Sequence, residues 1–295
     1  MPLAYRYYDA QTLDRQYNAR ATVEDISPFL AAYHEQTAAA RATLTCHLGL
    51  RYGGTPAERL DVFPAASAAE PSPVFVYLHG GYWRLLDAAD SAFMAPAFTQ
   101  AGICVVAVNY ALAPEVSLDD IVRQCRAALA WVFGHIGEFG GDATRVHVSG
   151  SSAGAHLAAM LIAPGWQAQF GLPEDAVAGA TLLSGLYDLE PMRMSYINEW
   201  VQLDAAAAHR NSPMFHLPVR PLRLLFSYAP NETDEFKRQT ETYLAACRAV
   251  GCHCEFVTMP GTNHFDLVLA TADPTTALTA AIFRGIQVPA SNARP

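Results

Sequence analysis

The stretch Gly150-Ser151-Ser152-Ala153-Gly154 combines the residue types that can present a serine as a nucleophile. It follows the β-rich run RVHVSG and precedes AHLAAM, whose small residues favour a helix. A tight turn from strand to helix strains its central residue, and glycines two positions to either side of Ser152 remove Cβ atoms that would clash there. Turns of small residues produce the same pattern by chance, but the strand–turn–helix setting favours Ser152 as a nucleophile.

A serine hydroxyl attacks poorly at neutral pH unless a base removes its proton, and the base needs an orienting acid. Where such a turn carries the nucleophile, the acid and then the histidine follow it along the chain. His264, in PGTNHFDLV, follows the last expected strand in a loop that can reach over the sheet. We therefore predict His264 as the base rather than a structural histidine. The other histidines after the serine lie in expected helix, insertion or strand segments: His156, His209, His216 and His253.

The acid is expected in APNETDEFKRQ, which follows the strand-like run LRLLFSY. This segment offers Glu232, Asp234 and Glu235. Glu232 lies early in the loop, from which its side chain can reach back to the imidazole. Asp234 can instead begin the next helix, whose N-terminus favours a carboxylate. We prefer Glu232, and Asp234 stays open as the alternative.

Attack on a carbonyl group also requires donors for the oxyanion that develops in the transition state. The stretch YLHGGYWR at 77–84 leaves a strand through Gly80-Gly81, where backbone amides can approach a ligand without interference from side chains. An ordinary turn at a strand end is the alternative. Because a second strand ends at the Ser152 turn, we expect the glycine pair to contribute oxyanion donors.

Apolar β-rich runs recur along the chain and predict strands. We expect the sheet that they form to position the candidate residues. Helical patterns separate the later runs, over 118–133, 152–163, 234–250 and 274–284. This alternation predicts an α/β fold with a mainly parallel sheet of about eight strands covered on both faces, and ligands gather at the carboxyl ends of such strands. The first two runs are close enough to pair as an antiparallel hairpin. The eight runs are TLTCHLGLRYG, RLDVF, VFVYLHG, ICVVAVNY, RVHVSG, GATLLSG, LRLLFSY and CEFVTMP.

Two segments do not fit the alternation, and both can cover a site. Residues 1–40 look helical and amphipathic, and residues 187–217 form a long, aromatic-rich insertion of the kind that serves as a lid or binding loop. We expect both to belong to a single domain over 1–295. Aromatic side chains that can contact a substrate, with core or lid packing as the alternative, are Tyr82, Trp83, Tyr187, Tyr196 and Trp200.

Composition limits the partners of the chain. Its formal net charge is −9 and it has no basic cluster, so nucleic acid and anionic membranes are poor partners. No apolar run reaches the roughly 18 residues of a transmembrane helix, and the N-terminus lacks a signal-peptide pattern. The six cysteines are scattered, which favours free thiols in the cytoplasm. Cys252-His253-Cys254 lacks the paired spacing of a zinc site, so we expect no metal.

Several motifs resemble one family over about residues 12–284. The stretch His79-Gly80-Gly81-Tyr82-Trp83 resembles the HGGxW signature of kynurenine formamidases, also called arylformamidases. These enzymes lie in the hormone-sensitive-lipase-like branch of the α/β hydrolases. The segments GSSAGAHLAA, NYALAPE, SGLYDLEPM and NHFDLV are similar to the same family or branch. The resemblance therefore implies an α/β-hydrolase fold with a small cap.

Carried over by position, the resemblance implies Ser152 as nucleophile and His264 as base. It also implies an oxyanion hole formed by the main-chain amides of Gly81, Tyr82 and Ala153. The family's acid is usually an aspartate in a segment resembling D-S-P-x-F. Here the matching stretch reads ETDEF from residue 232, so a glutamate takes the place of the acid and the neighbouring aspartate stays an alternative.

We expect a serine hydrolase that cleaves an aryl formamide such as N-formylkynurenine, without a metal or organic cofactor. A short-acyl carboxylesterase acting on aromatic or small esters is the alternative. A non-catalytic small-molecule-binding homologue is disfavoured, because such proteins usually lack a member of the catalytic triad. The expected partner is a small ester or formamide, and the resemblance makes a homodimer possible.

Overall fold

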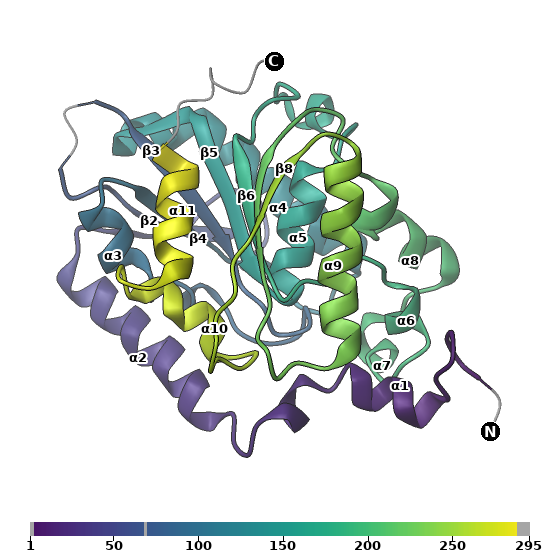
Figure 1. Ribbon diagram of the computed structural model, residues 1–295. Coiled ribbons are helices and arrows are strands. Elements are labelled where there is room, and N and C mark those ends of the chain that lie inside the picture. The colour runs from purple at the N-terminus through teal and green to yellow at the C-terminus, as the bar shows by residue number, and fades with distance from the viewer. Residues whose placement is uncertain (1–2, 68–69, 288–295) are drawn as a thin grey trace.

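The computed structural model describes residues 3–67 and 70–287. Within them, eight strands form one sheet in the order β1-β2-β4-β3-β5-β6-β7-β8 (Figure 1). β2 pairs antiparallel with β1 and β4, and all other neighbours are parallel. The predicted α/β class, parallel sheet and antiparallel hairpin are confirmed. The strands are β1 (His47–Arg51), β2 (Arg59–Phe63), β3 (Ser72–Leu78), β4 (Cys104–Val108), β5 (Gly141–Ser151), β6 (Gly179–Leu183), β7 (Arg223–Ser227) and β8 (His253–Phe256).

The central strands are buried on both faces, as a parallel sheet requires. In β3, Val74, Val76 and Leu78 join one apolar core, whereas Phe75 and Tyr77 join the other. This period of two follows from the alternation of side chains along a strand. The sheet therefore separates two hydrophobic cores and forms a rigid base for the loops at its carboxyl edge.

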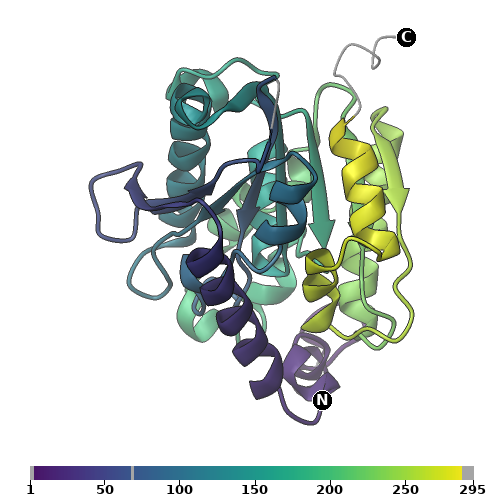
Figure 2. The ribbon, with the colours of Figure 1, turned by 90° about the vertical axis from the view of Figure 1, so that its left-hand side faces the viewer.

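Helices cover both faces of the sheet. α4 (Leu118–His135), α5 (Ala153–Ile162) and α9 (Asp234–Ala249) bury apolar side chains in one core. α3 (Ala95–Gln100) and α11 (Ala277–Gln287) bury apolar side chains in the second core. Figures 1 and 2 show α11 packed against one face of the sheet. The four helices expected from periodicity are therefore confirmed, with ends shifted by a few residues.

The N-terminal segment contains α1 (Ala10–Gln16), the 3₁₀ turn η1 (Ala19–Thr22) and α2 (Ser27–Thr43). Figure 1 shows it, in purple, along the bottom of the molecule. It is anchored there by the hydroxyl of Tyr17, which donates to the Glu235 carboxylate at the start of α9 over 2.6 Å.

Residues 187–217 form short helices rather than a sheet extension. The backbone amide of Tyr196 in this insertion donates to Asp14 Oδ1 over 2.8 Å, so the insertion and the N-terminal segment are joined. Of the range assigned to a single domain, residues 1–2, 68–69 and 288–295 lie outside the described part. The helices of the insertion are α6 (Glu190–Arg193), α7 (Asn198–Val201), α8 (Ala205–Arg210) and η5 (Pro213–Phe215).

Short helices complete the connections between strands. Across the described ranges, no helix is both long and apolar enough to cross a membrane. The remaining elements are η2 (Ala88–Asp90), η3 (Ile136–Phe139), η4 (Gln167–Phe170), α10 (Asp266–Leu269) and η6 (Ala270–Ala272).

Candidate active site

Ser152 occupies the turn between β5 and α5, where its backbone has φ 57° and ψ −121°. Such a conformation costs a non-glycine residue about 1–3 kcal/mol. The turn is held because the Ser152 amide donates to Leu183 O on β6 over 2.8 Å. A Cβ atom at Gly150 would lie 2.2 Å from the carbonyl carbon of Gly154, and one at Gly154 would lie 2.0 Å from Leu78 O. The two glycines are therefore required by close backbone approach.

His264 lies in the loop between β8 and α10, and its Nδ1 is 3.0 Å from Glu232 Oε1. Both residues are buried, with exposed fractions of 6% and 4%. A carboxylate can only accept, so the proton of a neutral imidazole sits on Nδ1 and leaves Nε2 with a free lone pair. Phe236 meets the His264 ring at an angle, with ring centroids 4.8 Å apart. This arrangement suits an imidazole that accepts a proton through Nε2.

Glu232, in the loop between β7 and α9, receives a second hydrogen bond at the same oxygen from the hydroxyl of Ser184. Asp234 is instead exposed as the first residue of α9. Glu235 binds the Tyr17 hydroxyl and forms an ion pair with Arg238. Among the three candidate acids, the structure therefore brings only Glu232 to His264.

The loop that leaves β3 lies directly against the Ser152 turn. A Cβ atom at Gly80 would be 2.8 Å from Ser151 O and 3.4 Å from the Ser152 Cβ. Gly81 has φ 94°, and a Cβ there would approach Leu85 O to 2.4 Å. Both glycines are thus needed for the loop to approach the serine.

Three backbone amides in this region are candidates for an oxyanion hole. Those of Gly81, Tyr82 and Ala153 donate to no acceptor in the described part of the chain. Ala153 begins α5, whose N-terminus carries partial positive charge. The carbonyl of Tyr82 is fixed by the Trp200 indole, whose Nε1 donates to it over 3.1 Å. The donors are therefore available, and the Trp200 indole holds their loop at the Tyr82 carbonyl.

Ser152 and His264 line one cavity of about 680 Å³. Both side chains are described, and no hydrogen bond joins them. One part of the wall is apolar and comes largely from α2 and the α10 region, including Leu30, Tyr33 and Val268. The lining also contains aromatic and charged residues. It includes Tyr82, Tyr196, Trp200, Arg20, Arg84 and Glu199.

Two of the aromatic residues predicted to contact substrate do not line this cavity. Trp83 is fully buried, and its Nε1 donates to His156 Nδ1 over 3.2 Å. Tyr187 is also fully buried and stacks on Tyr243, with ring centroids 4.3 Å apart. For both residues the assignment is corrected to core packing. Tyr196 and Trp200 do line the cavity.

The other histidines considered from sequence lie apart from the Glu232 pair. His156 is buried beside the indole described above, and burial lowers its pKa to about 4. His209 stacks on Phe215 within the insertion, and His253 is exposed in β8. In the described ranges, no group of three or more His, Cys, Asp or Glu residues is arranged to hold a metal ion.

A family model described as the α/β hydrolase fold matches residues 75–267. Kynurenine formamidase of Salmo salar is 33% identical over 91% of this chain and 92% of its own length. The Danio rerio kynurenine formamidase is 31% identical over 92% of each chain. The chain belongs to the kynurenine formamidase family of α/β hydrolases. This hydrolase also resembles the solved structure of a candidate thioesterase from a Silicibacter species, with a TM-score of 0.80 and 26% identity over 92% of this chain and 98% of that one.

Some cavity residues of the hydrolase were missed in the sequence analysis. Asn18, Arg20 and Tyr33 reach the cavity from the N-terminal segment, which was predicted as a cap without any residue being assigned to ligand contact. No local pattern marks these residues, because their role depends on how the segment packs across the carboxyl edge. Arg84 directly follows the HGGYW stretch, and this position was its only available signal.

Proposed function

We propose that this hydrolase cleaves an aryl formamide, such as N-formylkynurenine, through a formyl-enzyme on Ser152. The observation that carries the proposal is the buried Glu232–His264 pair, whose imidazole lines the same cavity as Ser152. The family's kynurenine formamidases, matched over about nine-tenths of the chain, support a formamide as the substrate.

In the first half-reaction, Ser152 Oγ attacks the formyl carbon and passes its proton to His264 Nε2. The carboxylate of Glu232 stabilises the resulting imidazolium through Nδ1. The amides of Gly81, Tyr82 and Ala153 donate to the oxyanion of the tetrahedral adduct. Removing one such donor typically costs about 3 kcal/mol of transition-state stabilisation.

Collapse of the adduct breaks the bond between the formyl carbon and the aryl nitrogen. His264 gives its proton to that nitrogen, and the arylamine leaves. In the second half-reaction, His264 removes a proton from water as the water oxygen attacks the formyl ester. The adduct collapses, His264 returns its proton to Ser152 Oγ, and formic acid leaves and ionises to formate. The cycle is balanced without a cofactor.

A short-acyl carboxylesterase is the second candidate function. A formyl group occupies little space, whereas the cavity has a volume of about 680 Å³ and an apolar wall that includes Leu30 and Val268. This wall favours esters with an apolar acyl or alcohol group. The same Ser152 chemistry would cleave them, with an alcohol in place of the arylamine.

Initial rates on N-formyl-L-kynurenine and p-nitrophenyl acetate, with Ser152→Ala as the blank, test both functions. A kcat/KM for the formamide far above that for the ester, lost in Ser152→Ala, supports the formamidase. Rapid ester turnover with negligible formamide cleavage contradicts it and supports the carboxylesterase. Mass spectrometry after treatment with diisopropyl fluorophosphate is expected to find one adduct on Ser152.

Residues 1–40 and 187–217 are proposed to act as one cap within a single domain. Their hydrogen bond through Asp14 and the cavity contacts of Tyr196 and Trp200 support this role. Limited proteolysis tests it: substrate should slow cleavage in both segments together.

Cytoplasmic location and homodimer formation are also proposed. The location is supported by six cysteines that are all free thiols. The homodimer has family resemblance as its only support. Sedimentation equilibrium tests it directly, and a monomer at micromolar concentration would reject it.

A further inference from the structure

Three charged side chains line the Ser152 cavity, each from a different segment. Arg20 comes from η1, Arg84 from the loop after β3, and Glu199 from α7. All three residues are exposed to solvent. Together they give the cavity wall two positive charges and one negative charge, beside many apolar and aromatic residues.

None of these three residues forms an ion pair within residues 3–67 and 70–287. The fourth charged residue at the cavity, Asp90, already faces His34 at 3.2 Å. Elsewhere many arginines are paired, as Arg210 is with Asp119. The three charges at the wall are therefore available to a ligand.

Arg84 is also fixed relative to the candidate oxyanion loop. Its backbone amide donates to Gly81 O over 3.0 Å. Its guanidinium carbon lies 4.8 Å from the centre of the Trp200 ring, and that indole in turn donates to Tyr82 O. A cation over an aromatic face is attracted to it and loses conformational freedom. The guanidinium is thus held over Trp200, which contacts the loop that carries the donors, and this favours binding of a group attached to the substrate.

We propose that Arg84, Arg20 and Glu199 form a subsite for the zwitterionic amino-acid end of an aryl substrate. The carboxylate binds the arginines, with Arg84 as its main contact, and the ammonium group binds Glu199. This inference rests on the proposed function, because it concerns the leaving group of the reaction assigned to Ser152. The aromatic part of such a substrate occupies the apolar portion of the cavity.

The charge balance favours a zwitterion over a simple anion. A guanidinium binds a carboxylate through two parallel hydrogen bonds, whereas a neutral ester offers no partner for either charge. The whole chain carries −9, so an anionic substrate is repelled at long range. A zwitterion has no net charge and escapes this repulsion, yet it matches both signs at the wall.

Aryl acetates test the subsite without relying on formamide cleavage. O-acetyl-L-tyrosine carries the complete amino-acid group, O-acetyltyramine lacks its carboxylate, and 3-(4-acetoxyphenyl)propanoic acid lacks its ammonium group. For the full-length enzyme, we expect kcat/KM to be highest for O-acetyl-L-tyrosine. In Arg84→Gln its advantage over O-acetyltyramine should fall about tenfold, mainly through KM, as for the loss of a charged hydrogen bond. In Glu199→Gln, the ratio of kcat/KM for O-acetyl-L-tyrosine to that for 3-(4-acetoxyphenyl)propanoic acid should fall instead.

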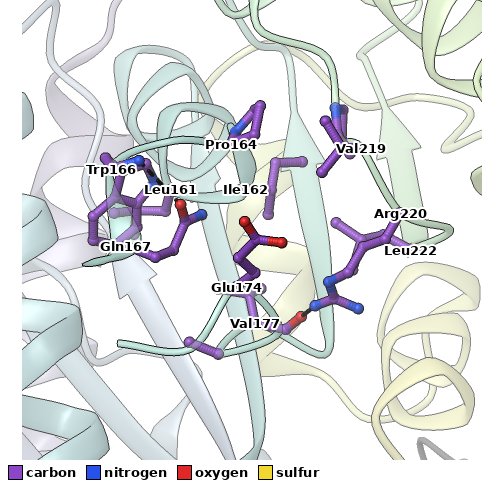
Figure 3. A pocket seen from close by; sticks show the side chains of 12 residues that line it. Leu161, Ile162, Pro164, Trp166, Gln167, Glu174, Val177, Val219, Arg220 and Leu222 are labelled. Atoms are coloured by element: carbon purple, nitrogen blue, oxygen red, sulfur yellow. Dashed lines mark hydrogen bonds between the residues drawn. The ribbon is translucent and has the colours of Figure 1, made fainter. Parts of the chain in front are cut away.

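Two exposed residues away from the cavity supply matched controls. Arg51 lies in β1. Glu174 lines a different cavity, of about 20 Å³, which Arg220 also lines; Figure 3 shows the side chains around it. Arg51→Gln and Glu174→Gln should leave all three substrate ratios unchanged. If Arg84→Gln lowers kcat/KM for every acetate equally, or leaves the ratios as they are, the subsite is rejected. Failure to cleave N-formyl-L-kynurenine, with the ratios shifting as expected, would reject the formamidase function and leave the subsite supported.

Discussion

Trp83 Nε1 donates to His156 Nδ1 over 3.2 Å, which joins the loop after β3 to the helix that follows Ser152. Because Nδ1 accepts, the proton of the neutral imidazole sits on Nε2, which donates to Asn211 O over 2.7 Å. Burial lowers the pKa of His156 to about 4, so the ring stays neutral near pH 7. One buried imidazole therefore connects the candidate oxyanion loop, the helix after the nucleophile and the insertion.

Replacing Trp83 with phenylalanine should loosen this connection. Trp83→Phe leaves a buried Nδ1 without a donor, at a cost of about 1–3 kcal/mol in the free energy of unfolding. We expect a kcat reduced about tenfold with a smaller change in KM, since oxyanion donors act in the transition state. Urea unfolding and steady-state rates measure the two effects. Trp131→Phe, at a half-buried position in α4, is the control. Unchanged kcat in a destabilised Trp83→Phe would limit this residue to a structural role.

The choice of acid can be tested by removing one charge at a time. Glu232→Gln keeps the size of the side chain but cannot orient His264 in the same tautomer, and a comparable change in a Ser–His–Asp site lowers kcat about 10⁴-fold. Glu232→Asp retains the charge on a shorter side chain, so its activity should fall between those of wild type and Glu232→Gln. Asp234→Asn, at the exposed start of α9, should keep nearly full activity. The reverse pattern would assign the acid to Asp234.

Gly154 gives a stability test of the turn. In a helix, alanine is normally favoured over glycine by about 1 kcal/mol. A Cβ at this position, however, would lie 2.0 Å from the backbone oxygen of Leu78. Gly154→Ala should therefore lower the free energy of unfolding by at least about 1–3 kcal/mol and reduce kcat, because the turn must shift. Gly137→Ala has open space around its Cβ and should do neither. Equal stability of the two variants would contradict the packing argument.

The fold was predictable because its signals are local. Each strand coincides with a β-rich apolar run, and the helix over 118–135 shows its buried face directly in its spacing. The ends were less certain: the expected strand run at 43–53 contains β1, which covers only His47–Arg51. The residues at which a strand begins and ends depend on its pairing with neighbouring strands, which the run itself does not specify.

The candidate site was predictable only where a motif fixed a position. The serine turn, the glycine pair and the order of acid and histidine identified Ser152, Gly81, Glu232 and His264 in advance, and their catalytic roles stay predictions. The type of an aromatic residue does not determine its exposure, so Tyr187 was assigned to the cavity although it packs in the core. Arg20 reaches the cavity through contacts such as Asp14 with Tyr196, which are 182 positions apart.

The low pKa values of the buried histidines predict that the folded protein loses stability in acid. Burial lowers the pKa of His147 to about 3 and that of His79 and His156 to about 4, from an ordinary value of 6.5. Below pH 6.5 the unfolded chain takes up protons that the folded chain excludes. The contribution of these groups to the free energy of unfolding is therefore fully present above pH 6.5. It declines towards pH 4 by about 1.4 kcal/mol per pH unit for each group.

His147 offers a way to isolate one of these contributions, because it lies in β5 with Nε2 3.0 Å from the Thr181 hydroxyl oxygen. Free energies of unfolding in urea between pH 4.5 and 6 give the slope for wild type, which also includes carboxylates. In His147→Gln that slope should be smaller by about 1.4 kcal/mol per pH unit, whatever the variant's stability at pH 7. His253→Gln, at an exposed position in β8, should keep the wild-type slope. If His147→Gln also keeps it, the His147 imidazole binds its proton equally well in the folded and unfolded chains.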